Sequence, residues 1–404
     1  MNLSPLVCKI QNYAWGSRSF IAELQGRTVP APQPEAELWI GAHTGAPAEL
    51  VQGEARRRLD TVIASNSEAA LGSEVAQRFK GELPFLLKLL AAAEPLSLQA
   101  HPSAEQARAG FEREEGAHVD PARRNYKDAR HKSELIVALT PFVALSGFRP
   151  VERTRRLIAE LGVQTLSSVT APLAEEPAEP ALRTVFERLM QTDAVERAAL
   201  VREVRAAAAE RAARSRDFAS ELAWVERLHT LYPGDIGVVV ALLLNLLELA
   251  PFEGLYLPAG NLHAYLDGAG VEIMASSDNV LRGGLTKKAV NIPELLRVLR
   301  FGELEVAPLL PKRVGDEHVY PTPAEEFRLS YIEVRAPISL SRSRGPELLL
   351  VTEGRVRVEG EASALLLEAG SSAFVPASEG ALQVGGLGTL FRASVPEATL
   401  DSRR

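Results

Sequence analysis

Residues 151–231 differ in composition and in hydrophobic period from the sequence on either side of them. Ala, Arg, Glu and Leu dominate this block, as in residues 198–214, and its apolar positions recur with the period of a helix. On both sides, short apolar runs with aromatic and β-branched residues lie between Gly and Pro, a pattern typical of strands. A helical block inside such a chain predicts a mainly β fold with an inserted α-helical domain.

The length of 404 residues predicts two or three domains, because single cores seldom grow to this size. We expect residues 1–150 and 232–320 to form one β domain, with residues 151–231 as the helical domain inserted in it. Residues 321–404 alternate short apolar runs with glycine turns, which predicts a second β domain, either an antiparallel sandwich or a small barrel.

Local patterns add several expectations. Residues 55–80 predict helix, and residues 103–115 predict a helix with Ser103 as its N-cap. The three prolines and three glutamates of residues 172–180 predict a loop between helices. A proline-rich connection is expected to lead up to Pro323.

Charge and cysteine content restrict the partners and the compartment. A formal net charge of −7 gives no electrostatic reason to expect nucleic acid or an anionic membrane as partner. Cys8 is the single cysteine, so no intrachain disulfide is possible, and we expect a cytoplasmic protein. The most apolar run, residues 236–249, is shorter than the roughly 20 residues of a membrane span and predicts buried structure instead.

A metal site is predicted around residues 96–102. Gln99 and His101 alternate with apolar neighbours, so both side chains enter one cavity if the segment is a strand. Glu134 and His263 each lie at the edge of a strongly apolar segment. Any one of these histidines alone is more often a hydrogen-bonded structural residue. Together with an amide oxygen and a carboxylate that needs a cation when buried, they form a set that suits Zn²⁺ and its divalent neighbours.

The remaining histidines divide into two kinds. Four lie in polar or turn contexts without a companion: His43, His118, His229 and His318. His131, in contrast, stands beside Lys132 and Glu134 in a denser group than composition predicts.

Basic residues in segments that are otherwise apolar or rich in glycine are candidates for an anion site: Lys88, Lys132, Arg282, Lys287 and Lys288. Lys88 lies in a dense apolar run and is expected to face a polar cavity rather than solvent. The glycines after Arg282 allow a ligand to approach, so its guanidinium is suited to a phosphate or an enediolate. Solvation at the surface explains Lys287 and Lys288 equally well.

Seven motifs resemble, in order, those of the type I mannose-6-phosphate isomerases: QNYAWG at 11–16, ELWIG at 37–41, LQAHP at 98–102, HKSE at 131–134, YPGDIG at 232–237, HAY at 263–265 and SDNVLR at 277–282. The resemblance is firm over residues 10–148 and 231–301 and loose elsewhere.

The resemblance implies a cupin-like β-barrel (jelly-roll) that holds one Zn²⁺ per chain, and a second cupin-like β-sandwich at the C-terminus. Its implied metal ligands are Gln99, His101, Glu134 and His263. It implies that Arg282 is catalytic and that the pocket is lined by Lys88, Ser97, Lys132, Glu272 and Asp278, with Trp15, Glu37 and Tyr265 as further substrate-binding residues.

The implied reaction interconverts mannose 6-phosphate and fructose 6-phosphate through a cis-enediol. Four residues remain open as proton carriers: Glu272, Lys132, His131 and Asp278. Lys88 and Ser97 are the expected phosphate contacts. The expected partner is a small-molecule sugar phosphate, and the expected state is a monomer.

The sequence departs from the family motifs at a few positions, and two other functions fit the same residues. Ser133 stands where the motif has proline, which predicts a looser placement of Glu134. Arg130 and a turn at residues 267–270 are atypical and predict changes at the rim of the site. The rivals are a non-catalytic metal-containing cupin that binds a sugar phosphate and an Fe(II) oxygenase on a similar barrel; Gln99 and the absence of a redox-cofactor motif count against the oxygenase.

Overall fold

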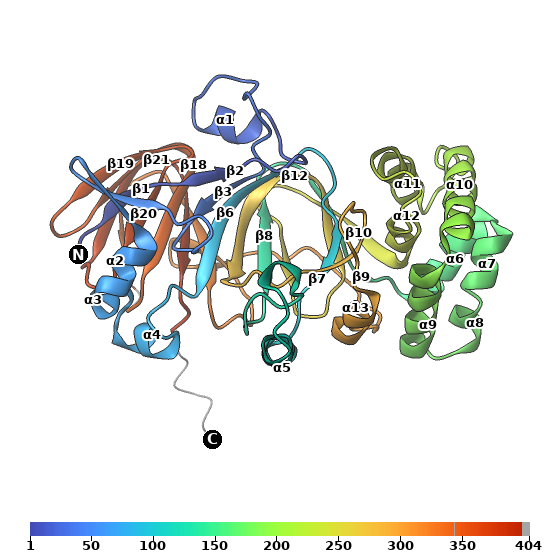
Figure 1. Ribbon diagram of the computed structural model, residues 1–404. Coiled ribbons are helices and arrows are strands. Elements are labelled where there is room, and N and C mark those ends of the chain that lie inside the picture. The colour runs from blue at the N-terminus through green and yellow to red at the C-terminus, as the bar shows by residue number, and fades with distance from the viewer. Residues whose placement is uncertain (343, 398–404) are drawn as a thin grey trace.

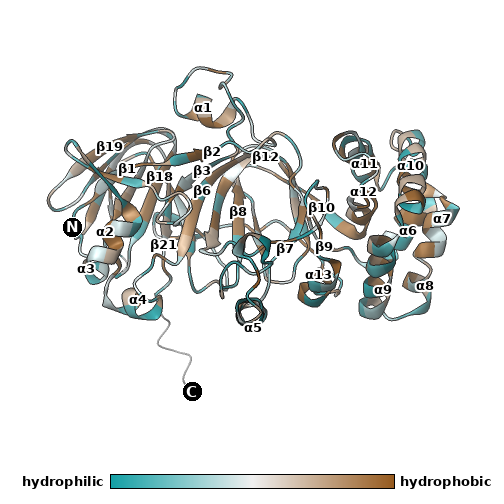
Figure 2. Ribbon diagram, viewed as in Figure 1, coloured by the Kyte–Doolittle hydropathy of each residue, from teal (hydrophilic) through white to brown (hydrophobic). Residues whose placement is uncertain are grey.

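The computed structural model describes residues 1–342 and 344–397, and it is an elongated molecule with three parts in a row (Figure 1). A β unit with the C-terminal strands lies at one end, a second β unit lies in the middle, and the helices of residues 151–231 lie at the other end. The prediction of a mainly β fold with an inserted helical block is confirmed. Figure 2 shows apolar strands in both β units and apolar faces on the insertion helices.

The middle unit is built on ten strands: β2 (Lys9–Gln11), β3 (Glu37–Ile40), β6 (Phe85–Ala92), β7 (Leu98–Ala100), β8 (Glu134–Ala138), β9 (Phe142–Phe148), β10 (Leu244–Leu249), β11 (Gly254–Leu257), β12 (His263–Ala275) and β13 (Leu281–Gly284). Strand β12 is central, because it pairs with β6 and β8 along its second part and with β7 and β9 at its start. It continues through Gly268, which has a φ of +110° and whose Cβ, if present, would lie 2.5 Å from the oxygen of Pro141. The turn expected at residues 267–270 is therefore wrong, since these residues lie inside one long strand.

The C-terminal unit is built on eleven strands: β1 (Ser4–Val7), β4 (Glu49–Gln52), β5 (Ala55–Arg58), β14 (Lys312–Val314), β15 (Glu317–Tyr320), β16 (Arg328–Val334), β17 (Ile338–Leu340), β18 (Glu347–Glu359), β19 (Ala364–Glu368), β20 (Ser372–Val375) and β21 (Leu382–Ser394). Strand β1 pairs with β20 on one side and with β4 on the other, so the N-terminus completes this sheet. Five strands of this sheet, β1, β4, β5, β14 and β15, lie in the residue ranges expected for the first β domain. Their hydrogen bonds instead join them to the C-terminal unit.

Two local predictions are wrong in this sheet. Residues 55–58 form β5 rather than helix, because the turn at Gly53 (φ +61°) folds them back on β4, and their charged side chains suit an exposed edge strand. The connection before Pro323 contains β14 and β15, which pair across a turn at Gly315 (φ +61°). Helices follow β5 as predicted: α2 (Leu59–Ser65), α3 (Ser67–Leu71) and α4 (Ser73–Arg78).

The helical insertion connects β9 to β10, which are antiparallel partners, so the strands pair across it. Its helices are α6 (Val151–Leu161), α7 (Gln164–Val169), α8 (Pro172–Glu175), α9 (Ala178–Gln191), α10 (Ala194–Arg211) and α11 (Ala219–Leu231). The loop predicted at residues 172–180 is wrong, because Pro172 opens α8 and Pro180 lies in the first turn of α9, where a helix needs no backbone N–H.

Three other helices are α1 (Phe20–Leu24), α5 (Ala104–Gly116) and α13 (Ile292–Val298). Ser103 caps α5 as predicted; its hydroxyl accepts from the N–H of Gln106 at 3.2 Å, and the Gln106 side chain accepts from the N–H of Ser103 at 2.9 Å.

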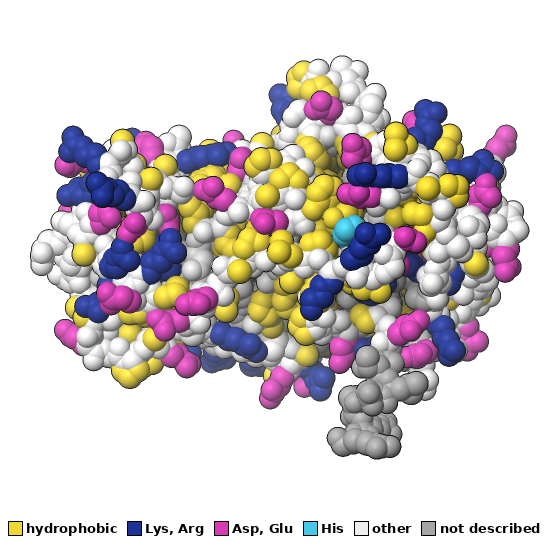
Figure 3. Space-filling model, turned by 180° about the vertical axis from the view of Figure 1, so that it is seen from behind, with side chains coloured by type: hydrophobic (Ala, Val, Ile, Leu, Met, Phe, Trp, Pro, Cys, Tyr) yellow, Lys and Arg dark blue, Asp and Glu magenta, His cyan; other side chains and the backbone are white. Residues whose placement is uncertain are grey.

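The apolar run 236–249 is largely buried in α12 (Gly237–Val240), a 3-10 turn (Ala241–Leu243) and β10. Among the described residues, no helix is long and apolar enough to cross a membrane. Seen from behind, acidic and basic side chains intermix toward the ends of the molecule, while hydrophobic side chains gather toward the middle (Figure 3).

Candidate metal centre and substrate cavity

Three buried side chains converge at the start of β8 and β12. The Nε2 atom of His101 lies 3.3 Å from one carboxylate oxygen of Glu134, and the Nε2 atom of His263 lies 3.4 Å from the other. All three side chains are at most 1% exposed, and their ligand atoms lie within 4.8 Å of one another. Two imidazoles and a carboxylate at this spacing suit a divalent metal.

Backbone carbonyls orient both imidazole rings. The Nδ1 atom of His101 lies 2.7 Å from the carbonyl oxygen of Asn279, and that of His263 lies 2.9 Å from the carbonyl oxygen of Asn261. A carbonyl only accepts, so each Nδ1 carries the proton and each Nε2 presents a lone pair toward Glu134. Both Nε2 atoms and one oxygen of Glu134 are buried without a hydrogen-bond partner, and such a set of acceptors suits a bound cation.

The protonation states also fit a metal. Burial lowers the pKa of His101 to about 4, so its ring is neutral near neutrality. Burial alone raises the pKa of Glu134, but the Lys132 ammonium, 3.0 Å away, is the largest opposing influence, and the net shift leaves the pKa well below its usual range. A neutral imidazole and an ionised carboxylate are the forms that coordinate.

The register of β7 places Gln99 beside this group. The Cα of Gln99 is the strand partner of His263 on one side and of Arg282 on the other. Its side chain lines the same cavity as Glu134. Gln99 as the fourth ligand remains a prediction that this position supports.

The centre opens into a cavity of about 1350 Å³. One wall is a group of three charged side chains from β3, β6 and β12, in which the Nζ atom of Lys88 lies 2.8 Å from Glu272 and 3.4 Å from Glu37. Burial raises the pKa of Glu272, and Lys88 opposes that rise. Burial lowers the pKa of Lys88, but the facing carboxylates outweigh it and keep the ammonium protonated. Lys88 therefore faces the cavity, as predicted.

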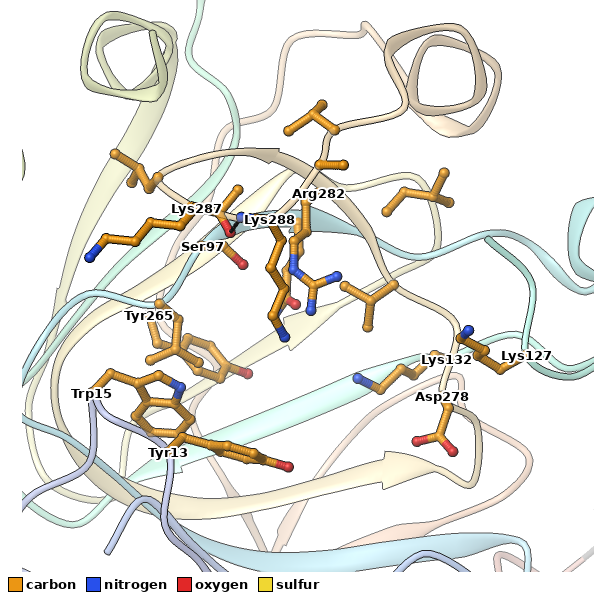
Figure 4. A pocket seen from close by; sticks show the side chains of 18 of the residues that line it. Tyr13, Trp15, Ser97, Lys127, Lys132, Tyr265, Asp278, Arg282, Lys287 and Lys288 are labelled. Atoms are coloured by element: carbon orange, nitrogen blue, oxygen red, sulfur yellow. Dashed lines mark hydrogen bonds between the residues drawn. The ribbon is translucent and has the colours of Figure 1, made fainter. Parts of the chain in front are cut away.

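The opposite wall carries cations (Figure 4). Arg282, on β13, points into the cavity; burial lowers its pKa, and no carboxylate of the described residues lies within 4.0 Å of its guanidinium. Lys288 extends in the same direction beside it, and Lys287, which also lines the cavity, turns away from Arg282. Ser97 lies next to this group. An unpaired guanidinium with a neighbouring ammonium is a binding site for a phosphate or an enediolate.

Aromatic rings form the cavity wall below the cations in Figure 4. The ring centroids of Tyr13 and Trp15 are 5.7 Å apart, and both side chains line the cavity. Tyr265, on β12, is 1% exposed, and burial raises the pKa of its hydroxyl well above the usual value. This wall offers a protonated hydroxyl and flat apolar faces to a ligand.

Comparisons with known proteins agree along the whole chain. Residues 3–151 match the catalytic domain of type I phosphomannose isomerase, residues 157–244 its helical insertion domain, and residues 316–395 the cupin domain of mannose-6-phosphate isomerase. The chain belongs to the type I phosphomannose isomerase family.

Relatives and solved structures of this family share the full architecture. Mannose-6-phosphate isomerase of Salmonella typhimurium is 37% identical over 96% of this chain and 99% of that protein, and the Homo sapiens protein is 34% identical over 87% and 88%. A zinc-bound mannose 6-phosphate isomerase and a point mutant of the Salmonella typhimurium enzyme each superpose with a TM-score of 0.88 at 34% identity, covering 98% of this chain and 100% of the other. The predicted fold class, with its C-terminal cupin unit, and zinc as the cofactor are thus confirmed.

Of the four candidate proton carriers, His131 is the one that does not line the cavity. Lys132, Glu272 and Asp278 line the cavity, but His131 does not; its Nε2 atom lies 2.8 Å from Glu326 of the C-terminal unit. His131 is therefore misplaced for direct proton transfer.

His43 was wrongly judged to lack a companion. Its Nε2 atom lies 3.4 Å from the carboxylate of Asp278, and its Nδ1 atom accepts from the N–H of Gly45 at 3.2 Å, which leaves the proton on Nε2. The hydrogen bond from His43 lowers the pKa of Asp278. The SDNVLR motif contains Asp278, but none of the motifs contains His43.

Ser133 and Arg130, the two departures from the family motifs, have different surroundings. The carbonyl of Ser133 accepts from the N–H of Ala275 at 3.0 Å, and Glu134 pairs with Leu257 on one side and Met274 on the other. Strand pairing, rather than a proline ring, places Glu134. Arg130 does not line the cavity and pairs with Glu82 at the surface.

Proposed function

We propose that this chain is a zinc-dependent aldose–ketose isomerase that interconverts D-mannose 6-phosphate and D-fructose 6-phosphate. The observation that carries the proposal is the opening of a buried imidazole and carboxylate cluster into one cavity with an unpaired guanidinium, Arg282. The family relatives named mannose-6-phosphate isomerase support the choice of substrate.

The chemistry moves one proton between two carbons. A base removes the proton from C2 of the open-chain aldose, a cis-enediol(ate) forms, and a proton returned to C1 leaves the ketone at C2. Zinc held by His101, Glu134 and His263, with Gln99 as fourth ligand, supplies Lewis-acid stabilisation of oxygen charge. Arg282 supplies a fixed positive charge for the enediolate.

Glu272 is our choice for the proton carrier. Burial raises the pKa of Glu272 toward the range of an effective base, and its carboxylate lines the cavity. Asp278 has a lowered pKa, and the ammonium of Lys132 is engaged by Glu134. We propose that Glu272 takes and returns the proton, with Lys88 stabilising its ionised form.

The phosphate is assigned to the cationic wall. Lys88 was expected to contact it, but the ammonium of Lys88 is engaged by Glu272 and Glu37. Lys288 points into the cavity without a carboxylate partner among the described residues and lies near Ser97. We therefore propose Lys288 and Ser97 as phosphate contacts, with Trp15 and Tyr265 against the sugar.

We also propose an oligomeric state and a cellular compartment. We propose that the protein acts as a monomer, because the described residues of one chain bring the candidate metal ligands and Arg282 to one cavity. The single cysteine supports a cytoplasmic protein.

A coupled assay that supplies mannose 6-phosphate and detects fructose 6-phosphate tests the proposal. We expect turnover with mannose 6-phosphate and none with unphosphorylated mannose. Tight binding of mannose 6-phosphate without turnover in zinc-loaded protein would instead favour the non-catalytic sugar-phosphate cupin.

A further inference from the structure

An ion pair joins the C-terminal unit to the segment that carries the metal ligand Glu134. Glu326, just before β16, lies 2.8 Å from the Nε2 atom of His131, and the two side chains are only 17% and 27% exposed. His131 begins the segment that carries Lys132 and the metal ligand Glu134. A contact across the two β units thus lies three residues from a ligand.

The same segment is anchored from the other side within the middle unit. The carbonyl of Arg130 accepts from the side chain of Asn279 at 2.8 Å and from the hydroxyl of Ser277 at 3.2 Å. Asn279 also orients His101 through its carbonyl. Residues 130–134 are therefore held between the segment that positions one ligand and the C-terminal unit.

Charge strengthens the contact. The hydrogen bond with Glu326 raises the pKa of His131. Burial raises the pKa of Glu326, but His131 outweighs burial and the net shift is downward. A partly buried contact between an imidazole and a carboxylate restrains the segment more than an exposed one does.

We propose that Glu326 is a positioning residue of the isomerase site, which acts through His131 to hold Lys132 and Glu134 in register with the two histidine ligands. His131 then has a positioning role in place of the proton-carrier role expected for it. The proposal assigns the C-terminal unit a part in the reaction, and for its kinetic readout it rests on the proposed isomerase function.

The neighbouring residue provides a matched control. Glu325 pairs with Arg78 of α4 at 2.7 Å, but its side chain is 77% exposed and does not touch the ligand segment. Glu325→Gln removes the same charge one residue away without breaking a contact to the ligand segment. A general effect of losing a carboxylate from this part of the C-terminal unit appears in both variants, whereas a positioning role affects only Glu326→Gln.

The experiment compares zinc-loaded wild type, Glu326→Gln and Glu325→Gln. For Glu326→Gln we expect kcat to fall about tenfold or more and zinc transfer to a chromogenic chelator to accelerate about tenfold or more, as for groups that orient metal ligands. We expect KM to change less than about twofold, because the proposed phosphate contacts lie elsewhere. Glu325→Gln should match wild type in all three quantities.

Equal kcat and equal zinc release in the two variants would overturn the proposal. If Glu326→Gln fails to fold, Glu326→Asp, which keeps the charge and shortens the reach, provides the same comparison. Zinc release requires no turnover, so an inactive wild type would refute the proposed function while the positioning proposal is still decided.

A double-mutant cycle separates positioning from chemistry. His131→Asn should lower kcat to the same extent as Glu326→Gln, and the double variant should be no worse than either. A loss in His131→Asn far beyond that of Glu326→Gln would show that His131 acts on the substrate itself and would overturn the assignment.

Discussion

Both β units bury a cluster of charged side chains, but the two clusters differ in whether they are complete. In the C-terminal unit, Arg392 donates to Glu347 at 2.8 and 2.6 Å and to Glu317 at 2.5 Å, and the hydroxyl of Ser330 donates to the other oxygen of Glu317 at 2.7 Å. In the middle unit, three ligand atoms lack any hydrogen-bond partner. The carboxylates of the first cluster are engaged by guanidinium and hydroxyl donors, whereas the ligand atoms of the second need a cation.

The contrast separates a structural charge cluster from a site. Burial of ionised groups costs free energy in both places, and each unit offsets the cost differently. Within residues 1–342 and 344–397, the group of His101, Glu134 and His263 is the one set of acidic, histidine or cysteine side chains spaced for a metal. Glu134 of this set lines a cavity, whereas the guanidinium of Arg392 is enclosed by its own partners.

Metal removal gives the largest expected difference between the two clusters. Prolonged chelation should abolish isomerase activity, because the middle cluster loses its cation, and added Zn²⁺ should restore it. Activity and zinc content measured on the same samples test this. Full activity in zinc-free protein would contradict the metal centre.

Breaking the closed cluster should instead cost stability. Arg392→Met removes the buried cation that joins Glu347 to Glu317 and leaves only Arg342 and Arg328 beside these carboxylates, so we expect the free energy of unfolding to fall by about 3 kcal/mol in urea titrations. Arg357→Met, which removes an exposed pair with Glu359, is the control and should cost less than about 1 kcal/mol. The zinc content of folded Arg392→Met should be normal; equal stability of the two variants would show that the closed cluster contributes little.

Arg282→Ala tests the open side of the cavity. Loss of the fixed charge should lower kcat/KM by about 10²- to 10³-fold while zinc content and thermal stability are kept. Arg313→Ala, at an exposed residue of β14 that does not line the cavity, should change kcat/KM little. Near-normal turnover of Arg282→Ala would remove it from the mechanism.

The ligand set was predictable because its members carry local signals. Gln99 and His101 alternate along one strand, and Glu134 and His263 begin buried strands, so strand pairing brings them together. The position of Lys88 followed from a single charge in an apolar strand, since such a charge needs a polar environment.

Contacts between distant segments were not predictable in the same way. The pairing of β1 with β20 joins residues from opposite ends of the chain, and no local pattern encodes it. The basic residues of β5 have no alternation because the whole strand is exposed, so helix was the natural reading. The surroundings of His43 and His131 were not predictable for a related reason: their partners, Asp278 and Glu326, are remote in sequence.

The smallest expected effect concerns His43. The hydrogen bond from His43 lowers the pKa of Asp278, so His43→Asn should let that pKa return upward toward its usual value. Asp278 is then still ionised near neutrality, and kcat/KM there should change by less than about threefold, the size of one long hydrogen bond. Below about pH 5 the variant loses the Asp278 charge before wild type does, so the ratio of variant to wild-type activity should fall as the pH is lowered. A ratio that stays constant from pH 7 to the acid limit of folding would show that the reaction does not depend on the charge of Asp278.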